Sequence, residues 1–249
     1  MVDIDTVSRR RKELTPRVVD AECIFVGGPT PAFVGANIKK TRELAVAAGR
    51  DPYDIKFFVQ FTPILGATDE EAREKLARYK KYAITDGGLA LFGGISNIDV
   101  SKFPPGEEFP TDPEHPLLRV IEAARKRRLL VRPDGYERWT PETLGDFQSI
   151  GGSGTFKVGS GKTVADEIER WVTEADVDGF NIGHVVVPGA WEDVVEYLIP
   201  ELDRRGWLGN GDYAVPGGTA RENLYRSPGD PQLRSTHPGE KYKFVSGEK

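Results

Sequence analysis

The chain contains a single cysteine, Cys23, and only three histidines among its 249 residues. One cysteine cannot form an internal disulfide, so a reducing compartment is the expected setting. Within the apolar run "ECIFVGG", Cys23 is expected to be a small buried hydrophobe and not an activated thiolate. The three histidines are scattered and give none of the ligand spacings of a zinc site, so no metal centre is expected.

Long apolar runs and an excess of positive charge are also missing. No stretch approaches the roughly 20 apolar residues that span a membrane. The amino terminus lacks the apolar core of a signal peptide. The formal net charge is −5, whereas proteins that bind nucleic acids usually carry clustered positive charge. These absences predict a cytoplasmic protein that binds neither membranes nor nucleic acids.

What the sequence does contain is an alternation of strand and helix patterns. Apolar runs predict strands at 22–27, 55–61 and 179–186, and the second of these alternates apolar positions with Lys56 and Gln60. Because helical patterns separate the strands, the chain is expected to be an α/β protein with a parallel sheet. Three parallel strands alone leave unpaired edges and little shielded core, so strands are expected to be missing from this count.

Helix starts are marked by hydroxyl side chains. Thr30, followed by a proline, and Thr68, followed by acidic residues, are each expected to cap a helix. Thr163 is the predicted cap of a third helix, "VADEIERWVTEA". A fourth helix is predicted over 188–206 and ends at a glycine.

Two segments have a different character. Residues 86–155 are rich in glycine and proline, and this stretch predicts a lid-like insertion without strands, interrupted by one helix at about 117–130. Residues 209–249 are polar and punctuated by glycine and proline, so an extended or disordered tail is expected there.

The stretch "KVGSGKT" invites comparison with a phosphate-binding loop. That loop needs a glycine five residues before the glycine of Gly-Lys-Thr, and this position is occupied by Phe156. A bulky side chain there obstructs the backbone curl that aims successive N–H groups at phosphate oxygens. We therefore reject an ATPase of this type.

A longer stretch that includes this loop resembles a known family. The motifs are "FKVGSGKTVADEIERWV", "DGFN", "PGAWEDVVEYLIPELDRRG" and "TARENL", with "AECIFVGGPTP" and "VQFTPILGATDEEAREK" upstream. They resemble the bacterial-luciferase-like flavin-dependent monooxygenases, in the branch typified by nitrilotriacetate monooxygenase component A and dibenzothiophene-sulfone monooxygenase. The resemblance covers residues 21–225.

The resemblance implies a partial (β/α)₈ TIM barrel of luciferase-like type. Residues 21–208 correspond to its last three strand–helix units plus the insertion. The serine-rich phosphate turn that the family carries upstream of this part is not visible in residues 1–20, which form a non-matching segment. A fragment, a split subunit or an incomplete gene model would show the same pattern.

The function implied by the resemblance is oxidation of a small organic substrate with O₂. Reduced FMN is the implied cofactor, supplied by a separate NAD(P)H:FMN reductase. An alternative function is a non-catalytic half-barrel subunit or fragment, which covers its open sheet edges by pairing with another chain or as a homo-oligomer.

Candidate site residues follow from the strand ends, because barrel active sites lie at the carboxyl ends of strands. His184 is the catalytic candidate, able to hydrogen-bond flavin or substrate; a structural hydrogen bond is the favoured alternative. Gln60 is a candidate flavin contact with the same alternative. Gly159 and Ser160 lie where N–H groups at a helix start can bind an anion, although a helix cap and turn is the favoured interpretation.

Overall fold

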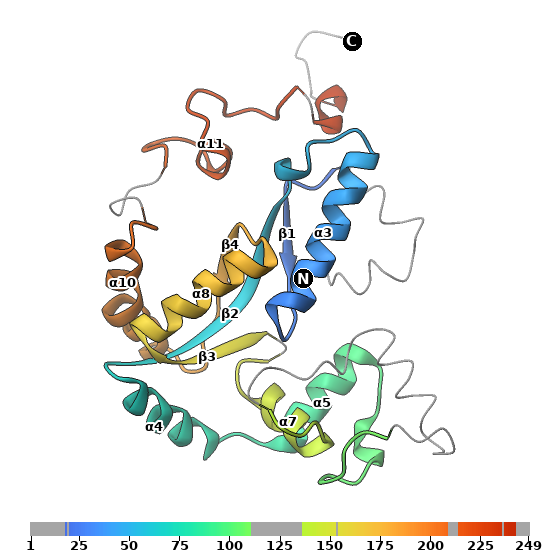
Figure 1. The fold of residues 1–249 in the computed structure, drawn as a ribbon, viewed down its shortest axis with the longest axis vertical. Helices are drawn as coiled ribbons and strands as arrows, with labels where there is room; N and C mark the ends of the chain where they lie inside the picture. The colour runs from blue at the N-terminus through green and yellow to red at the C-terminus, as the bar shows by residue number, and fades with distance from the viewer. Residues whose placement is uncertain are drawn as a thin grey trace.

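A computed structural model gives the arrangement of the chain (Figure 1). It describes residues 18, 20–110, 136–152, 154–208, 214–235 and 237–242. Apart from Val18 and Asp20, the segment 1–20 lies outside these residues. The helix expected at 117–130 also lies outside them. Among the described residues, no helix is both long and apolar enough to cross a membrane.

Four parallel strands form the central sheet: β1 (Cys23–Val26), β2 (Lys56–Gly66), β3 (Thr155–Ser160) and β4 (Gly179–Ile182). The strand order is β1–β2–β3, and β4 also pairs with β2. Every other described strand therefore pairs with β2. Val59 of β2, for example, lies in register with Val26 and with Phe180. The predicted α/β fold with a parallel sheet is confirmed.

The strand count differs from the sequence prediction, which had three strands. β3 escaped detection because "TFKVGS" is short and carries no alternating pattern. Pairing with the second half of β2 supports it, from Thr155 opposite Phe61 to Ser160 opposite Gly66. β4 is shorter than the predicted 179–186, because only four of its residues pair with β2.

Two predicted helix starts are confirmed. α3 (Pro31–Ala47) begins after Thr30, whose hydroxyl accepts a hydrogen bond from the Phe33 amide at 3.3 Å. α4 (Asp69–Lys80) begins after Thr68, and the Glu71 amide donates to the Thr68 hydroxyl at 3.2 Å. Each side chain satisfies an amide that the first helical turn leaves free. A short 3₁₀ turn, η1 (Pro52–Asp54), precedes β2.

The third predicted cap was wrong by one turn. α8 (Gly161–Ala175) begins after Ser160, and Thr163 is the residue whose amide donates to the Ser160 hydroxyl. The final predicted helix is confirmed and runs through α9 (Gly189–Asp193), the π-helical turn η3 (Val194–Leu198) and α10 (Ile199–Arg204). Gly206 follows it with a φ of +74°, which suits glycine.

One face of the sheet is covered by α3, α8 and η3. Phe57, Val59 and Phe61 of β2 are fully buried on this face, as the alternation in the sequence predicts. Figure 1 shows α3 beside β1 and α8 across β2. The helices contribute the other buried residues of this core: Val34, Ile38, Ala45, Val164, Ala165, Ile168, Trp171, Ala175, Val194 and Leu198.

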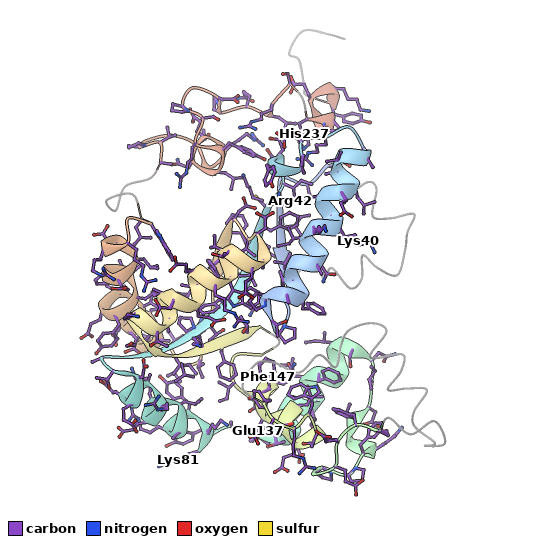
Figure 2. All side chains as sticks on the ribbon, viewed as in Figure 1. Lys40, Arg42, Lys81, Glu137, Phe147 and His237 are labelled. Carbon is purple, nitrogen blue, oxygen red and sulfur yellow. The ribbon has the colours of Figure 1, made fainter. Side chains whose placement is uncertain are left out.

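A buried arginine joins α3 to the strands (Figure 2). The Arg42 Nε donates to Asp176 Oδ2 at 2.6 Å, and its Nη1 donates to the carbonyls of Pro52 and Ile55 at 2.7 and 3.2 Å. The guanidinium also lies 4.9 Å from the centre of the Phe57 ring. Arg42 therefore fixes the start of β2 and the turn after α8 against α3.

The insertion is more regular than predicted. Its described part contains α5 (Thr85–Ser96), the 3₁₀ turn η2 (Val100–Lys102) and α7 (Pro141–Ser149). α5 and α7 approach closely at Gly88 and Gly145, where a Cβ on Gly88 would overlap the Gly145 carbonyl. The glycines that made the segment look irregular thus permit helix packing. A second core surrounds them: Phe92, Ile98, Val100, Phe103, Phe109, Trp139, Leu144 and Phe147.

The described parts of the tail also differ from the extended or disordered expectation. They contain α11 (Ala220–Tyr225) and the 3₁₀ turn η5 (Pro238–Tyr242). Arg221 forms an ion pair with Glu22 at 2.9 Å, and Arg234 forms one with Asp54 at 2.6 Å. These contacts hold the tail at the amino-terminal end of the strands, opposite the insertion (Figure 1).

Candidate functional site

The carboxyl ends of two strands, β1 and β4, lie beside the middle of β2. β1 ends at Val26, in register with Val59, and β4 ends at Ile182, in register with Phe61. β3 begins at the same level, with Thr155 opposite Phe61. Ligands of parallel α/β sheets bind at the carboxyl ends of strands. The candidate site is therefore the mouth around Gln60, and its neighbours come from four separate segments.

The second face of the sheet is not covered by the helices that form the main core. We call it the open face, and it consists of Cys23, Phe25, Lys56, Phe58, Gln60 and Asn181. Phe25 is 52% exposed, and its ring centre lies 6.1 Å from that of Phe58. The expectation that Cys23 is buried was wrong, because strand alternation points its side chain to this face, where it is exposed.

Gln60 lies on the open face at the mouth. It is half-buried, and the backbone of Gly154 passes so close that a Cβ there would lie 3.0 Å from Gln60 Cγ. Asn181 of β4 is in register with Gln60, so two side-chain amides stand next to each other. Within the described residues, neither amide has a hydrogen-bond partner. Both are therefore available to a ligand.

His184 follows β4 at the same mouth. The Gly183 amide donates to the Phe61 carbonyl at 2.8 Å, which fixes the backbone just before it. The imidazole is exposed, and its centre lies 5.5 Å from the Trp191 ring. No hydrogen bond within the described residues involves the imidazole. Among the residues that the structure describes, both ring nitrogens of His184 therefore lack a hydrogen-bond partner.

Gly159 and Ser160 have a different environment. The Ser160 amide and the Thr163 hydroxyl both donate to Asp69 Oδ1 at 2.7 Å. These hydrogen bonds, the amide first, lower the pKa of Asp69 to about 2. A carboxylate of the protein itself therefore occupies the start of α8. Gly159 lies against it, since a Cβ there would be 3.0 Å from Asp69 Oδ1.

The predicted site residues fall into two groups along β2. Gln60 and His184 lie at the level of Phe61, whereas Ser160 is in register with Gly66. Gly66 lies six positions after Gln60 in β2. At ~3.3 Å of rise per residue, this corresponds to about 20 Å along the strand. Ser160 therefore lies well beyond the level of Gln60 along the sheet.

Sequence reasoning missed Asn181 and the aromatic side chains of the insertion. Asn181 was detectable, because in "GFNI" it alternates with the apolar residues and therefore faces away from the core. Phe156 lies opposite Thr62, and its ring stacks on Phe147 at 5.6 Å. The Tyr136 ring centre lies 5.8 Å from that of Phe147, and burial raises the pKa of the Tyr136 hydroxyl to about 12. No local pattern predicts these contacts.

The mouth suits a planar organic cofactor better than a metal ion. Among the described residues, no group of three or more His, Cys, Asp or Glu side chains is placed to hold a metal. The amides and the imidazole instead offer donors and acceptors to the edge of a heterocycle. The Phe25 and Phe58 rings offer it an apolar surface.

Comparison with known proteins points to one family. The family model described as luciferase-like monooxygenase matches residues 2–178. The chain is similar to the dimethyl-sulfide monooxygenase of Hyphomicrobium sulfonivorans, with 37% identity over 81% of this chain and 40% of the relative. It is similar to the long-chain alkane monooxygenase of Geobacillus thermodenitrificans, with 32% identity over 96% of this chain and 48% of the relative. Both proteins used above to typify the branch are also among its relatives.

The fold has a close counterpart among solved structures. The crystal structure of DmoA from Hyphomicrobium sulfonivorans superposes with a TM-score of 0.74 at 32% identity. The match covers 94% of this chain and 47% of that chain. The chain thus spans less than half the length of the curated relatives that it matches.

Proposed function

Because the chain belongs to the luciferase-like monooxygenase family, we propose that it forms part of a flavin-dependent monooxygenase site. In this proposal its strands are part of the wall of a (β/α)₈ barrel, the last strand–helix units of that fold. Reduced FMN comes from a separate NAD(P)H:FMN reductase, and O₂ and a small organic compound are the co-substrates. The protein's task is to bind, orient and shield the cofactor.

One observation carries the proposal. Gln60 and Asn181 are in register near the carboxyl end of β4, His184 follows that strand, and none of the three side chains has a hydrogen-bond partner among the described residues. Polar side chains in folded proteins usually find such partners, so three that lack them at a barrel mouth point to a ligand. The site comes from β2, β4 and the turn after β4.

Each residue has a distinct role in the proposal. Gln60 and Asn181 hydrogen-bond the polar edge of the flavin, and His184 holds or donates a proton near the reacting oxygen. Phe25 and Phe58 support the apolar side of the ring system. Gly159 and Ser160 fix the start of α8, because the Ser160 amide is already bound to Asp69.

The substrate is proposed to be a small apolar compound. The two relatives described above are named for dimethyl sulfide and for long-chain alkanes, both apolar. The turn after β4 carries the exposed residues Val186 and Val187, and Trp191 of α9 lies beside the His184 ring. An apolar substrate would cover them. Bound reduced FMN would supply the reaction with O₂ that amino-acid side chains cannot perform.

The experiment uses a completed form of the chain. The segment of the dimethyl-sulfide monooxygenase that has no counterpart here is joined in front of this chain, in the order that the resemblance implies. The completed form is incubated with FMN, NADH, a flavin reductase, O₂ and dimethyl sulfide. Mass spectrometry of the oxygenated product gives the rate, and omission of the reductase is the blank.

Matched variants tie the activity to this chain. Gln60→Ala and His184→Ala should each lower the rate about tenfold or more, because each removes a group that contacts the flavin or the reacting oxygen. Gln232→Ala and His237→Ala, in the tail, should leave it unchanged. Equal effects of the mouth and tail variants would contradict the proposal. Product formation that survives both mouth variants would contradict it as well.

A further inference from the structure

We propose that Lys75 and Asp193 are positioning residues for His184. Their ion pair holds α9 against α4, and Trp191 of α9 in turn orients the imidazole. The inference rests on the proposed function for the role of His184. The contact between the imidazole and Trp191, however, can be measured without flavin or substrate.

The His184 ring has one recorded contact within the described residues. The backbone before it is fixed, because the Gly183 amide donates to the Phe61 carbonyl at 2.8 Å. The imidazole itself is exposed and forms no hydrogen bond in this part of the chain. Its centre lies 5.5 Å from that of the Trp191 ring. The direction of the imidazole therefore depends on where Trp191 stands.

The helix that carries Trp191 needs support from its surroundings. α9 has five residues, too few to form a stable helix by themselves. The core holds one side of it through Ala190 and Val194, which are 7% and 8% exposed. Trp191 is 40% exposed and lacks comparable packing. A second anchor is needed to fix the rotation of this short helix, and Asp193 supplies it.

The second anchor is an ion pair with α4. Lys75 Nζ lies 2.6 Å from Asp193 Oδ2, and these side chains are only 12% and 17% exposed. Within the described residues it is the only ion pair between α4 and α9. Exposed ion pairs contribute little, but a buried charge that loses its partner must move to reach water. Loss of either partner should therefore turn α9, and Trp191 with it.

α4 is a firm support for this anchor. It follows β2 directly, and its residue Ala72 is fully buried. Gly66 at the end of β2 lies so close that a Cβ there would be 2.7 Å from the Ala72 amide nitrogen. Asp69 also binds the first turn of α4 to the Ser160 amide. The ion pair thus connects β2, which carries Gln60, to the helix beside His184.

NMR of the chain with labelled histidine rings tests the contact. The sequence has three histidines, and His184→Ala identifies the His184 signal by its loss. Trp191→Leu gives the position of that signal without the indole, whose ring current displaces nearby protons. All spectra are recorded at one alkaline pH, so that protonation of the imidazole does not contribute.

Variants of the pair should release the ring. Lys75→Met and Asp193→Ala should each move the His184 signal most of the way to its position without the indole. They remove opposite charges, and urea unfolding verifies that each is folded, so either one alone carries the test. Lys75→Arg keeps a charged donor and should leave the signal near its wild-type position. Lys80→Met, in an exposed pair on the same helix, should leave it unchanged.

Kinetics of the completed form separate positioning from stabilisation. Lys75→Met should lower kcat about tenfold and change the KM for dimethyl sulfide less than about twofold, because a misplaced group weakens proton transfer and not substrate binding. Combined with His184→Ala, it should cause no further loss, because the pair acts through the imidazole.

Three results would overturn the proposal. The first is an unchanged His184 signal in folded Lys75→Met and Asp193→Ala. The second is an equal displacement of the signal by Lys80→Met. The third is a further loss of kcat when Lys75→Met is added to His184→Ala. Displacement of the signal without any effect on activity, or with an inactive completed form, would support the positioning of the imidazole and contradict only the proposed function.

Discussion

The two faces of the sheet differ although the same strands form both. Phe57 and Phe58 are neighbours in β2, yet Phe57 is fully buried under helices and Phe58 lies on the open face. The helices of this chain are sufficient to bury one face only. The comparison teaches that the chain builds a packed core on one side of the sheet and leaves aromatic and polar side chains exposed on the other.

We call the face of the sheet under α3, α8 and η3 the covered face. The largest expected effect comes from truncating a side chain in its core. Phe57→Ala should lower the free energy of unfolding by about 3–5 kcal/mol, because it leaves a cavity in the main core. Phe58→Ala should lower it by about 1 kcal/mol or less in the chain alone. Urea unfolding followed by tryptophan fluorescence gives both values. Equal losses would show that the two faces are equally packed.

Arg42 provides the next largest effect. Arg42→Met removes the donors to the Pro52 and Ile55 carbonyls and to Asp176, and should cost about 2–3 kcal/mol. Lys40→Met, at an exposed position of the same helix, should stay within about 0.5 kcal/mol of wild type. The same unfolding measurement tests both. A similar small change in both variants would mean that the Arg42 contacts do not stabilise the covered face.

Asp69 has a smaller and pH-dependent effect. Asp69→Asn should cost about 1–2 kcal/mol at pH 7, because the carboxylate accepts two hydrogen bonds at the start of α8. The folded pKa of about 2 lies below the ordinary value of 3.8, so the stabilisation is present above that value. It is lost as the pH falls through about 2.

Unfolding measured from pH 7 to pH 2 tests this prediction. The difference between wild type and Asp69→Asn should be constant at neutral pH and shrink below about pH 4. Glu70→Gln is the matched control at an exposed neighbouring position, and its effect should stay within about 0.5 kcal/mol. A difference between wild type and Asp69→Asn that does not change with pH would exclude the carboxylate as its source.

The tail should give the smallest change in global stability. Arg234→Ala removes a partly exposed ion pair with Asp54 and should cost about 0.2–1 kcal/mol. Limited digestion with thermolysin should nevertheless cleave the tail several-fold faster, because the pair holds it locally. Arg226→Ala, for which no ion pair is recorded within the described residues, is the control. Unchanged cleavage would contradict a holding role for Arg234.

Much of the covered face was predictable from local sequence. The alternation in β2 identified Phe57, Val59 and Phe61 as core residues, and hydroxyl caps located the starts of α3 and α4. Such features depend on neighbours in sequence, and the relevant signals are periodicity and caps. The alternation of strand and helix patterns also predicted the α/β class with a parallel sheet.

What the sequence did not reveal depends on contacts between distant residues. β3 is stable because it pairs with β2, and α5 is stable because Gly88 meets Gly145. Asp69 reaches Ser160 across 91 residues, so its occupation of the α8 start has no local signal. At the candidate site, Gln60 and His184 were predicted from strand ends, and their role stays a prediction. Asn181 required the register of β4 against β2.

The most direct test of the account is an FMN titration of two samples, the chain alone and the completed form. The account predicts that the completed form quenches flavin fluorescence with a Kd of about 1 μM and that the chain alone binds at least about tenfold more weakly. The reason is that the proposed flavin site needs the remaining strand–helix units of the barrel to exclude water. Equal affinity in both samples, or no binding to a completed form that is shown to be folded, would contradict it.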